Sequence, residues 1–226
     1  MAVAPLNKFV TKALPVGFHT ETVYETPTGV SSIILYAQVA NVGINTYPRV
    51  TLSHKRVSTR TKTLNNTNIT RIVKDIEVPP NDAVVIIDGR LVLERNARIK
   101  DSLIIEGTQD SDNVKVISDA EYTESTGLTT ITTSGNHGFA VGDEIVMSRL
   151  HFQSCDGHVG TTTYFFPDPQ RTFVVDAINI GGNANKFETN VGIVEGIRHY
   201  NYLANSGKVG PVQMEVILSI LESSLT

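Results

Sequence analysis

Apolar and polar residues alternate with a period of two along much of this chain of 226 residues. In residues 33–39, for example, every odd-numbered position is apolar, which places these side chains on one face of an extended strand. No strong apolar stripe of helical period runs for twelve residues or more. The pattern therefore predicts an all-β fold.

The C-terminal segment fits two patterns. Every even-numbered position in residues 212–220 is apolar: Val212, Met214, Val216, Leu218 and Ile220. Met214, Ile217, Leu218 and Leu221 would also form a helical stripe. We predict a strand, because the neighbouring segments are β-like and no helix N-cap signal is evident. We expect this strand to lie beside strands formed by residues 30–105.

Two segments carry turn or loop signals in the first half of the chain. Asp88-Gly89 separates the apolar runs 83–87 and 90–93, and this dipeptide suits a two-residue type I′ turn. The sequence thus predicts a tight hairpin centred on Asp88 and Gly89. Residues 58–70 are polar and rich in Thr and Asn, which indicates a long loop or a flexible hairpin tip.

The composition changes after Gly107. Short Thr-rich segments, suited to strands, are separated by glycines and asparagines, and this spacing is typical of a small barrel or sandwich. The predicted strands are 129–133, 144–147, 161–166 and 172–175.

Charge is distributed unevenly between the two parts. The first 100 residues contain 13 Lys and Arg against 7 Asp and Glu, a net charge of +6, whereas the remaining 126 contain 6 against 16, a net charge of −10. No acidic residue lies between Glu25 and Asp75. Such asymmetry can steer and orient a partner.

The basic residues in this interval are compatible with a solvated strand face and loop, and also with a contact surface for an acidic protein neighbour. Nucleic acid is disfavoured as the partner, because the stretch has only Tyr47 at its edge to stack on bases and the whole chain is acidic. The candidate assembly interface consists of Arg49, Lys55, Arg56, Arg60, Lys62, Arg71 and Lys74.

The best candidate for chemistry is the H-x₃-C-x₂-H run of His151, Cys155 and His158. A structural zinc site would need a fourth ligand, and nothing in the sequence indicates an activated thiol. We therefore predict a non-enzymatic protein without a catalytic or metal site and without a cofactor, although metal binding by these three residues stays open. No apolar run is long enough for a membrane helix, and no signal peptide is evident, so we expect no membrane association.

Several strand and turn segments resemble tailed-phage structural proteins, in particular those of marine cyanophages related to the T4-like myoviruses. Two further segments, 137–144 and 166–169, resemble small β modules of phage tail and fibre proteins. The segments that carry the first resemblance are 2–8, 23–30, 36–41, 76–83, 89–94 and 219–222.

The resemblance implies a discontinuous β-sandwich domain, residues 1–107 plus 209–226, with residues 108–208 as an inserted small β-barrel or sandwich domain. It also implies a virion structural protein, made in the host cytoplasm, that assembles with copies of itself and with other virion proteins. A tail, baseplate or neck accessory protein is our first expectation. The alternatives are a capsid-surface decoration protein and a module that binds a host surface glycan through Tyr164, Phe165 and Phe166.

Overall fold

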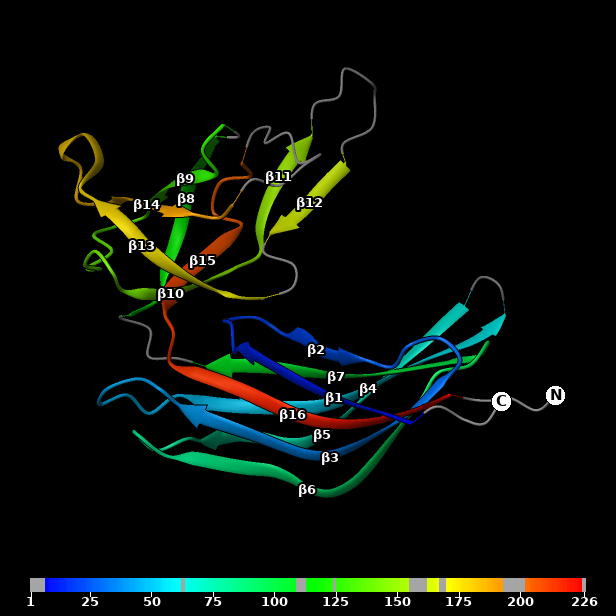
Figure 1. Ribbon diagram of the computed structural model, residues 1–226. Coiled ribbons are helices and arrows are strands. Elements are labelled where there is room, and N and C mark those ends of the chain that lie inside the picture. Colours follow the sequence, from blue (N-terminus) through cyan, green and yellow to red (C-terminus); the bar gives the residue numbers. More distant parts are fainter. Residues whose placement is uncertain are drawn as a thin grey trace. The chain divides into compact units, whose positions relative to one another are not determined.

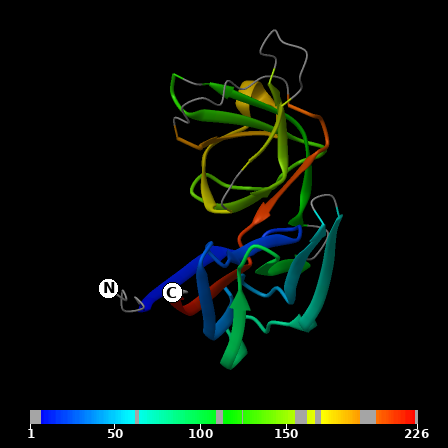
Figure 2. The same ribbon diagram turned by 90° about the vertical axis from the view of Figure 1, so that its right-hand side faces the viewer.

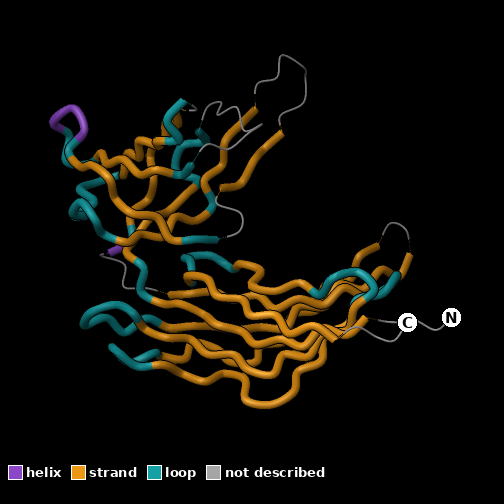
Figure 3. The backbone as a smooth tube through the Cα atoms, in the orientation of Figure 1, coloured by secondary structure: helices purple, strands orange, loops and turns teal. Residues whose placement is uncertain are grey.

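The computed structural model describes residues 7–61, 64–108, 113–123, 125–154, 162–166, 170–192 and 202–224. These residues form strands β1 to β16 and a one-turn 3₁₀ helix, η2 (Ile180–Gly182), so the predicted all-β class is confirmed (Figure 3). The chain divides into two compact units, residues 1–108 with 213–226 and residues 109–212.

The first unit is a sandwich of two four-stranded antiparallel sheets (Figure 1, Figure 2). Sheet A has the order β1 (Asn7–Pro15), β16 (Met214–Ser224), β3 (Val30–Asn41), β6 (Ala83–Glu94). Sheet B has the order β2 (Glu21–Glu25), β7 (Ile99–Thr108), β4 (Arg49–Thr61), β5 (Leu64–Glu77). The core between them includes Ile34, Leu52, Leu93, Leu103 and Leu218, all fully buried. The predicted discontinuous β-sandwich is therefore confirmed.

The C-terminal segment is the strand β16, as predicted. It lies between β1 and β3, and its register with β3 runs from the Met214–Asn41 pair to the Ser224–Val30 pair (Figure 1). Alternation decides which residues it buries: Met214, Val216, Leu218 and Ile220 face the core. The two ends of the chain thus complete one sheet.

The predicted hairpin at Asp88-Gly89 is wrong. Residues 83–94 form the single strand β6, which pairs with β3 on both sides of this dipeptide. The register shifts between the Ile34–Leu91 and Tyr36–Asp88 pairs, so Asp88 is paired and Gly89 begins a β-bulge. Gly89 has a φ of 154°, which side-chain-bearing residues rarely adopt. The turn-like dipeptide therefore bends a strand and does not reverse it.

We expect Gly89→Ala to lower the free energy of unfolding by about 1–3 kcal/mol, because alanine is strained at this φ although its Cβ meets no atom within 4 Å. Urea denaturation followed by circular dichroism measures the change. Gly135→Ala is the control, since Gly135 also has open space but no positive φ. An equal stability for both variants would contradict the assignment of strain to Gly89.

The polar segment 58–70 is also more regular than the loop interpretation predicted. Strands β4 and β5 continue through it as one long hairpin, pairing Val57 with Thr67 and Ser58 with Asn66. A long loop is therefore wrong, because cross-strand pairing with its own neighbour holds this Thr- and Asn-rich segment extended. The residues of the hairpin tip, 62 and 63, lie outside the described residues.

The second unit contains a closed six-stranded barrel and a separate hairpin. Its core includes Ile117, Ile131, Ile145, Phe187 and Val209. The barrel order is β10 (Glu144–Ser148), β13 (Thr172–Ile178), β14 (Lys186–Asn190), β9 (Leu128–Thr133), β8 (Lys115–Thr123), β15 (Gly207–Pro211). The hairpin pairs β11 (Leu150–Ser154) with β12 (Thr162–Phe166).

Strand β15 changes the expected domain boundary. It pairs with β10 and β8 and closes the barrel, so residues 209–211 belong to the second unit and not to the sandwich. The sandwich resumes at Gln213. The resemblance to tailed-phage structural proteins implied a boundary after residue 208, whereas the strand pairing places it after Val212.

Candidate assembly surface

The seven predicted interface residues do not share one face of the sandwich. Alternation along β4 places Thr51, Ser53 and Lys55 on the outer face of sheet B, whereas His54 and Arg56 lie on the same side as the buried Leu52. The basic residues of β4 are therefore divided between the outer face of sheet B and its core-facing side.

Arg56 lies on the inner side of sheet B with a partly exposed side chain, and it pairs with a buried carboxylate. Its Nε donates a hydrogen bond to Oδ1 of Asp101 at 2.7 Å, and its Nη2 donates to Oδ2 at 2.6 Å. The Asp101 side chain is 0% exposed, accepts a further bond from the Glu94 backbone N–H at 3.0 Å, and lies 3.3 Å from Nε2 of His54. Arg56 thus joins β4 to β7, and the predicted role in binding a partner is not supported by this contact.

The pKa of Asp101 is set by opposing effects. Burial disfavours the charged carboxylate, but the hydrogen bonds from Arg56 and the Glu94 backbone, together with the charges of Arg56 and His54, outweigh burial and hold the pKa of Asp101 below its ordinary value. Asp101 is therefore an ionised group buried with compensating donors.

The other predicted residues differ in their surroundings. Nη2 of Arg49 lies 3.7 Å from a carboxylate oxygen of Glu77, and both side chains are about half exposed, so this ion pair contributes little to stability. Lys74 is exposed on β5. The side chains of Arg60 and Lys62 lie outside the described residues.

Lys55 and Arg71 remain as cations on the outer face of sheet B. Within the described part of the chain, neither forms an ion pair. The register places Lys55 opposite Ile69 and Ser53 opposite Arg71. These two cations therefore accompany small polar and apolar side chains on this face.

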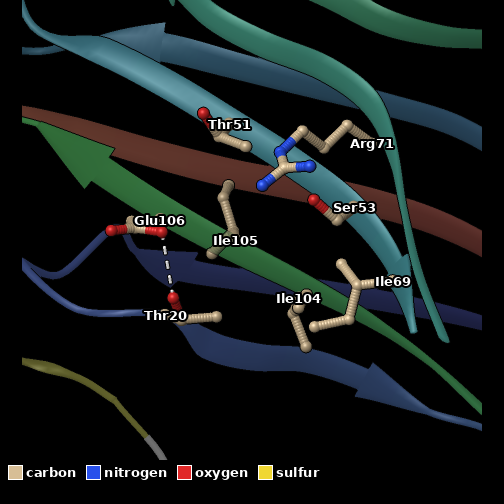
Figure 4. A pocket seen from close by; sticks show the side chains of 8 residues that line it. All are labelled: Thr20, Thr51, Ser53, Ile69, Arg71, Ile104, Ile105 and Glu106. Atoms are coloured by element: carbon tan, nitrogen blue, oxygen red, sulfur yellow. Dashed lines mark hydrogen bonds between the residues drawn. The ribbon is translucent and has the colours of Figure 1, made fainter. Parts of the chain in front are cut away.

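A shallow depression of about 140 Å³ lies on this part of sheet B (Figure 4). The guanidinium of Arg71 lies beside Thr51 and Ser53, and Thr20 donates a hydrogen bond to Glu106 at 3.0 Å on the other side of the depression. Its lining residues are Thr20, Thr51, Ser53, Ile69, Arg71, Ile104, Ile105 and Glu106. The depression can accept an apolar side chain between isoleucines, with polar groups at its rim.

The outer face of sheet A is unusually apolar for an exposed sheet. The strand registers align two rows across all four strands, Phe9–Leu221–Ile33–Val92 and Ala13–Ile217–Gln38–Val85. Phe9 is 76% exposed, and Ile217, Val85 and Val92 are between 41% and 49% exposed. The first row is apolar on all four strands, and an exposed apolar row of this kind is a candidate interaction surface.

Sequence reasoning missed this face. A visible signal was that residues of both parities are apolar in β6 and β16: Val92 follows Leu91, and Ile217 precedes Leu218. A strand with one wet face alternates apolar and polar residues, so apolar residues on both sides indicate that the second face is also covered.

The residues considered for chemistry lie in the second unit. His151 is on β11 and pairs in register with Phe165 of β12, whereas Cys155 and His158 lie outside the described residues. Among described residues, no group of three His, Cys, Asp or Glu side chains could hold a metal ion. The side chains of Tyr164, Phe165 and Phe166, considered for glycan binding, are not described.

The fold and these surfaces define a two-unit all-β protein with an exposed apolar sheet. No protein-family model matches the chain, and no curated protein matches it. No helix within the described ranges is long and apolar enough to cross a membrane.

Proposed function

We propose that this chain is a non-enzymatic structural component of a tailed-phage virion, where it assembles with copies of itself and with other virion proteins. The observation that carries the assembly role is the outer face of sheet A, on which Phe9, Ile217, Val85 and Val92 are exposed together. When a partner covers such an apolar face, its removal from water lowers the free energy of the complex.

The resemblance of the strand and turn segments to tailed-phage structural proteins supports the virion as the site of assembly. A tail, baseplate or neck accessory position is proposed first, because the second unit resembles small β modules of tail and fibre proteins at residues 137–144. A decoration protein on the capsid surface is the alternative position.

Quantitative mass spectrometry of purified particles of the virus that encodes this chain tests the proposal. We expect the protein in the particles at a fixed ratio to the major structural proteins, after the particles have been separated from free protein on a density gradient. The same measurement on isolated tails and on isolated DNA-free capsids distinguishes the two positions, because the protein should be found in only one of them. A protein that is abundant in infected cells but missing from purified particles would contradict the proposal.

A further inference from the structure

We propose that the outer face of sheet A in one copy of this chain packs on the outer face of sheet B in a second copy. This inference deepens the proposed function, on which it rests, by naming the surface that covers each exposed sheet. It commits to a head-to-tail contact, in which two different faces of the same molecule meet.

The apolar rows provide the driving force. Phe9, Leu221, Ile33 and Val92 cross sheet A in one line, and association is favoured when such apolar side chains are removed from water. Sheets that pack face to face interdigitate their side chains at about 10 Å separation. The face of a second β-sheet is therefore a suitable partner for this surface.

Charge selects which sheet provides the cover. The outer face of sheet A carries Asp88 opposite Tyr36 and Glu215 opposite Ala40, and neither carboxylate forms an ion pair among described residues. The outer face of sheet B carries the cations Lys55 and Arg71, which form no ion pair within the described part of the chain. It also carries the carboxylate of Glu106, which accepts a hydrogen bond from Thr20. Two copies of sheet A would bring carboxylates toward carboxylates, whereas sheet A against sheet B brings carboxylates toward cations.

The two faces are also complementary in shape. Phe9 is the most exposed of the apolar side chains measured on sheet A. Sheet B has the depression between Ile69 and Ile104, with Arg71 at its rim. A projecting aromatic ring on one face and an apolar depression on the other are the parts of an interface hot spot.

A contact between two different faces leaves one face of each kind free at the ends of a dimer. Further copies then add by the same contact, and the series closes into a ring or continues as a filament. The arrangement therefore produces assemblies larger than a dimer from one type of interface.

The test uses two charge-reversal variants of the full chain in sedimentation velocity experiments. We expect the wild-type protein to associate in a concentration-dependent manner at low salt, since screening weakens the contact at high salt. Lys55→Glu/Arg71→Glu and Asp88→Lys/Glu215→Lys should each associate at least about tenfold more weakly, because each brings like charges together.

Mixing the two variants is the decisive measurement. In the mixture, the reversed sheet A of one variant meets the reversed sheet B of the other, and the two native faces also meet. Opposite charges then face each other in both contacts, so we expect the mixture to associate as the wild type does. A packing of sheet A on sheet A predicts a different outcome, in which Lys55→Glu/Arg71→Glu associates normally. That outcome would overturn the inference, as would a wild-type protein that stays monomeric at every concentration and salt tested.

Phe9→Ser tests the apolar part of the contact, with Ile44→Ser as its matched control. Both side chains are highly exposed, but Ile44 lies between strands β3 and β4 and not on either sheet face. We expect only Phe9→Ser to weaken association, with unchanged melting of the monomer; equal effects would contradict the proposed anchor. Particle composition is measured independently, so a protein found in virions without this self-association would refute the interface alone.

Discussion

Truncation after Val212 is expected to unfold the sandwich while the barrel stays folded. The deletion removes β16, which lies inside sheet A and pairs with β1 on one side and β3 on the other. It also removes the buried side chains of Met214, Val216, Leu218 and Ile220, each of which contributes roughly 1.5–3 kcal/mol by its burial. A loss of this size is comparable with the whole stability of an ordinary domain.

The barrel retains all its strands in this truncation, because β8 to β15 lie within residues 109–212. Hydrogen exchange measured by mass spectrometry distinguishes the two units. We expect amide protection to be lost in residues 7–108 and kept in the barrel strands. Persistent protection of β3 and β6 in the truncated protein would show that β16 is dispensable, contrary to this structure.

Two point variants on adjacent residues of β16 provide a milder form of the same test. Leu218 faces the core and is fully buried, so Leu218→Ala should cost about 2–5 kcal/mol. Ser219 faces the other side of the sheet, and Ser219→Ala should change the unfolding free energy by less than about 0.5 kcal/mol. Urea denaturation of both variants measures the difference between the faces.

Asp101→Asn is expected to lower the free energy of unfolding by about 2–3 kcal/mol. The amide keeps one acceptor oxygen, but its NH₂ group takes the place of the other carboxylate oxygen. That oxygen is either Oδ1, which accepts from Nε of Arg56, or Oδ2, which accepts from both Nη2 of Arg56 and the Glu94 backbone N–H. Removal of one partner from a buried ion pair can cost more, but Arg56 is 39% exposed and partly regains water.

The same carboxylate gives a pH dependence with a definite sign. Because the folded pKa of Asp101 lies below its ordinary value, its contribution to stability is present above about pH 4 and is lost as the pH falls through the lower folded pKa. We therefore expect the difference between wild type and Asp101→Asn to shrink in acid. Thermal melts between pH 7 and pH 2 measure it.

Glu77→Gln is the matched control for Asp101→Asn. It also neutralises a carboxylate beside an arginine, but the Arg49–Glu77 pair is about half exposed and 3.7 Å apart. We expect a change below about 0.5 kcal/mol for this variant. Equal costs for the two variants would show that burial of Asp101 has no special role.

The all-β class and the position of β16 could be predicted because alternation is a local property of strands. The Asp88-Gly89 hairpin could not be excluded locally, since the dipeptide suits a tight turn. Pairing with the long strand β3 on both sides overrides this preference and uses Gly89 for a bulge. Pairing with a strand that is distant in the sequence therefore determines that Gly89 lies in a bulge and not in a turn.

The candidate site was only partly predictable. The alternation along β4 puts Arg56 on the side of Leu52, which argues against its place in the predicted interface. Its partner Asp101 is distant in the sequence and is brought close by the pairing of β4 with β7. The apolar face of sheet A depends on three strand registers at once, because Phe9, Leu221, Ile33 and Val92 come from four strands. A row of this kind becomes visible only when the strand order is known.

The two ends of the barrel segment leave the sandwich at neighbouring points. Gly107 of β7 is so close to Met214 of β16 that a Cβ built on the glycine would lie 2.9 Å from the methionine methyl group. Residues 109–212 therefore leave and rejoin the strands of the sandwich at nearly the same place. A segment of different length or sequence between these two points would leave the strand pairing of sheets A and B unchanged.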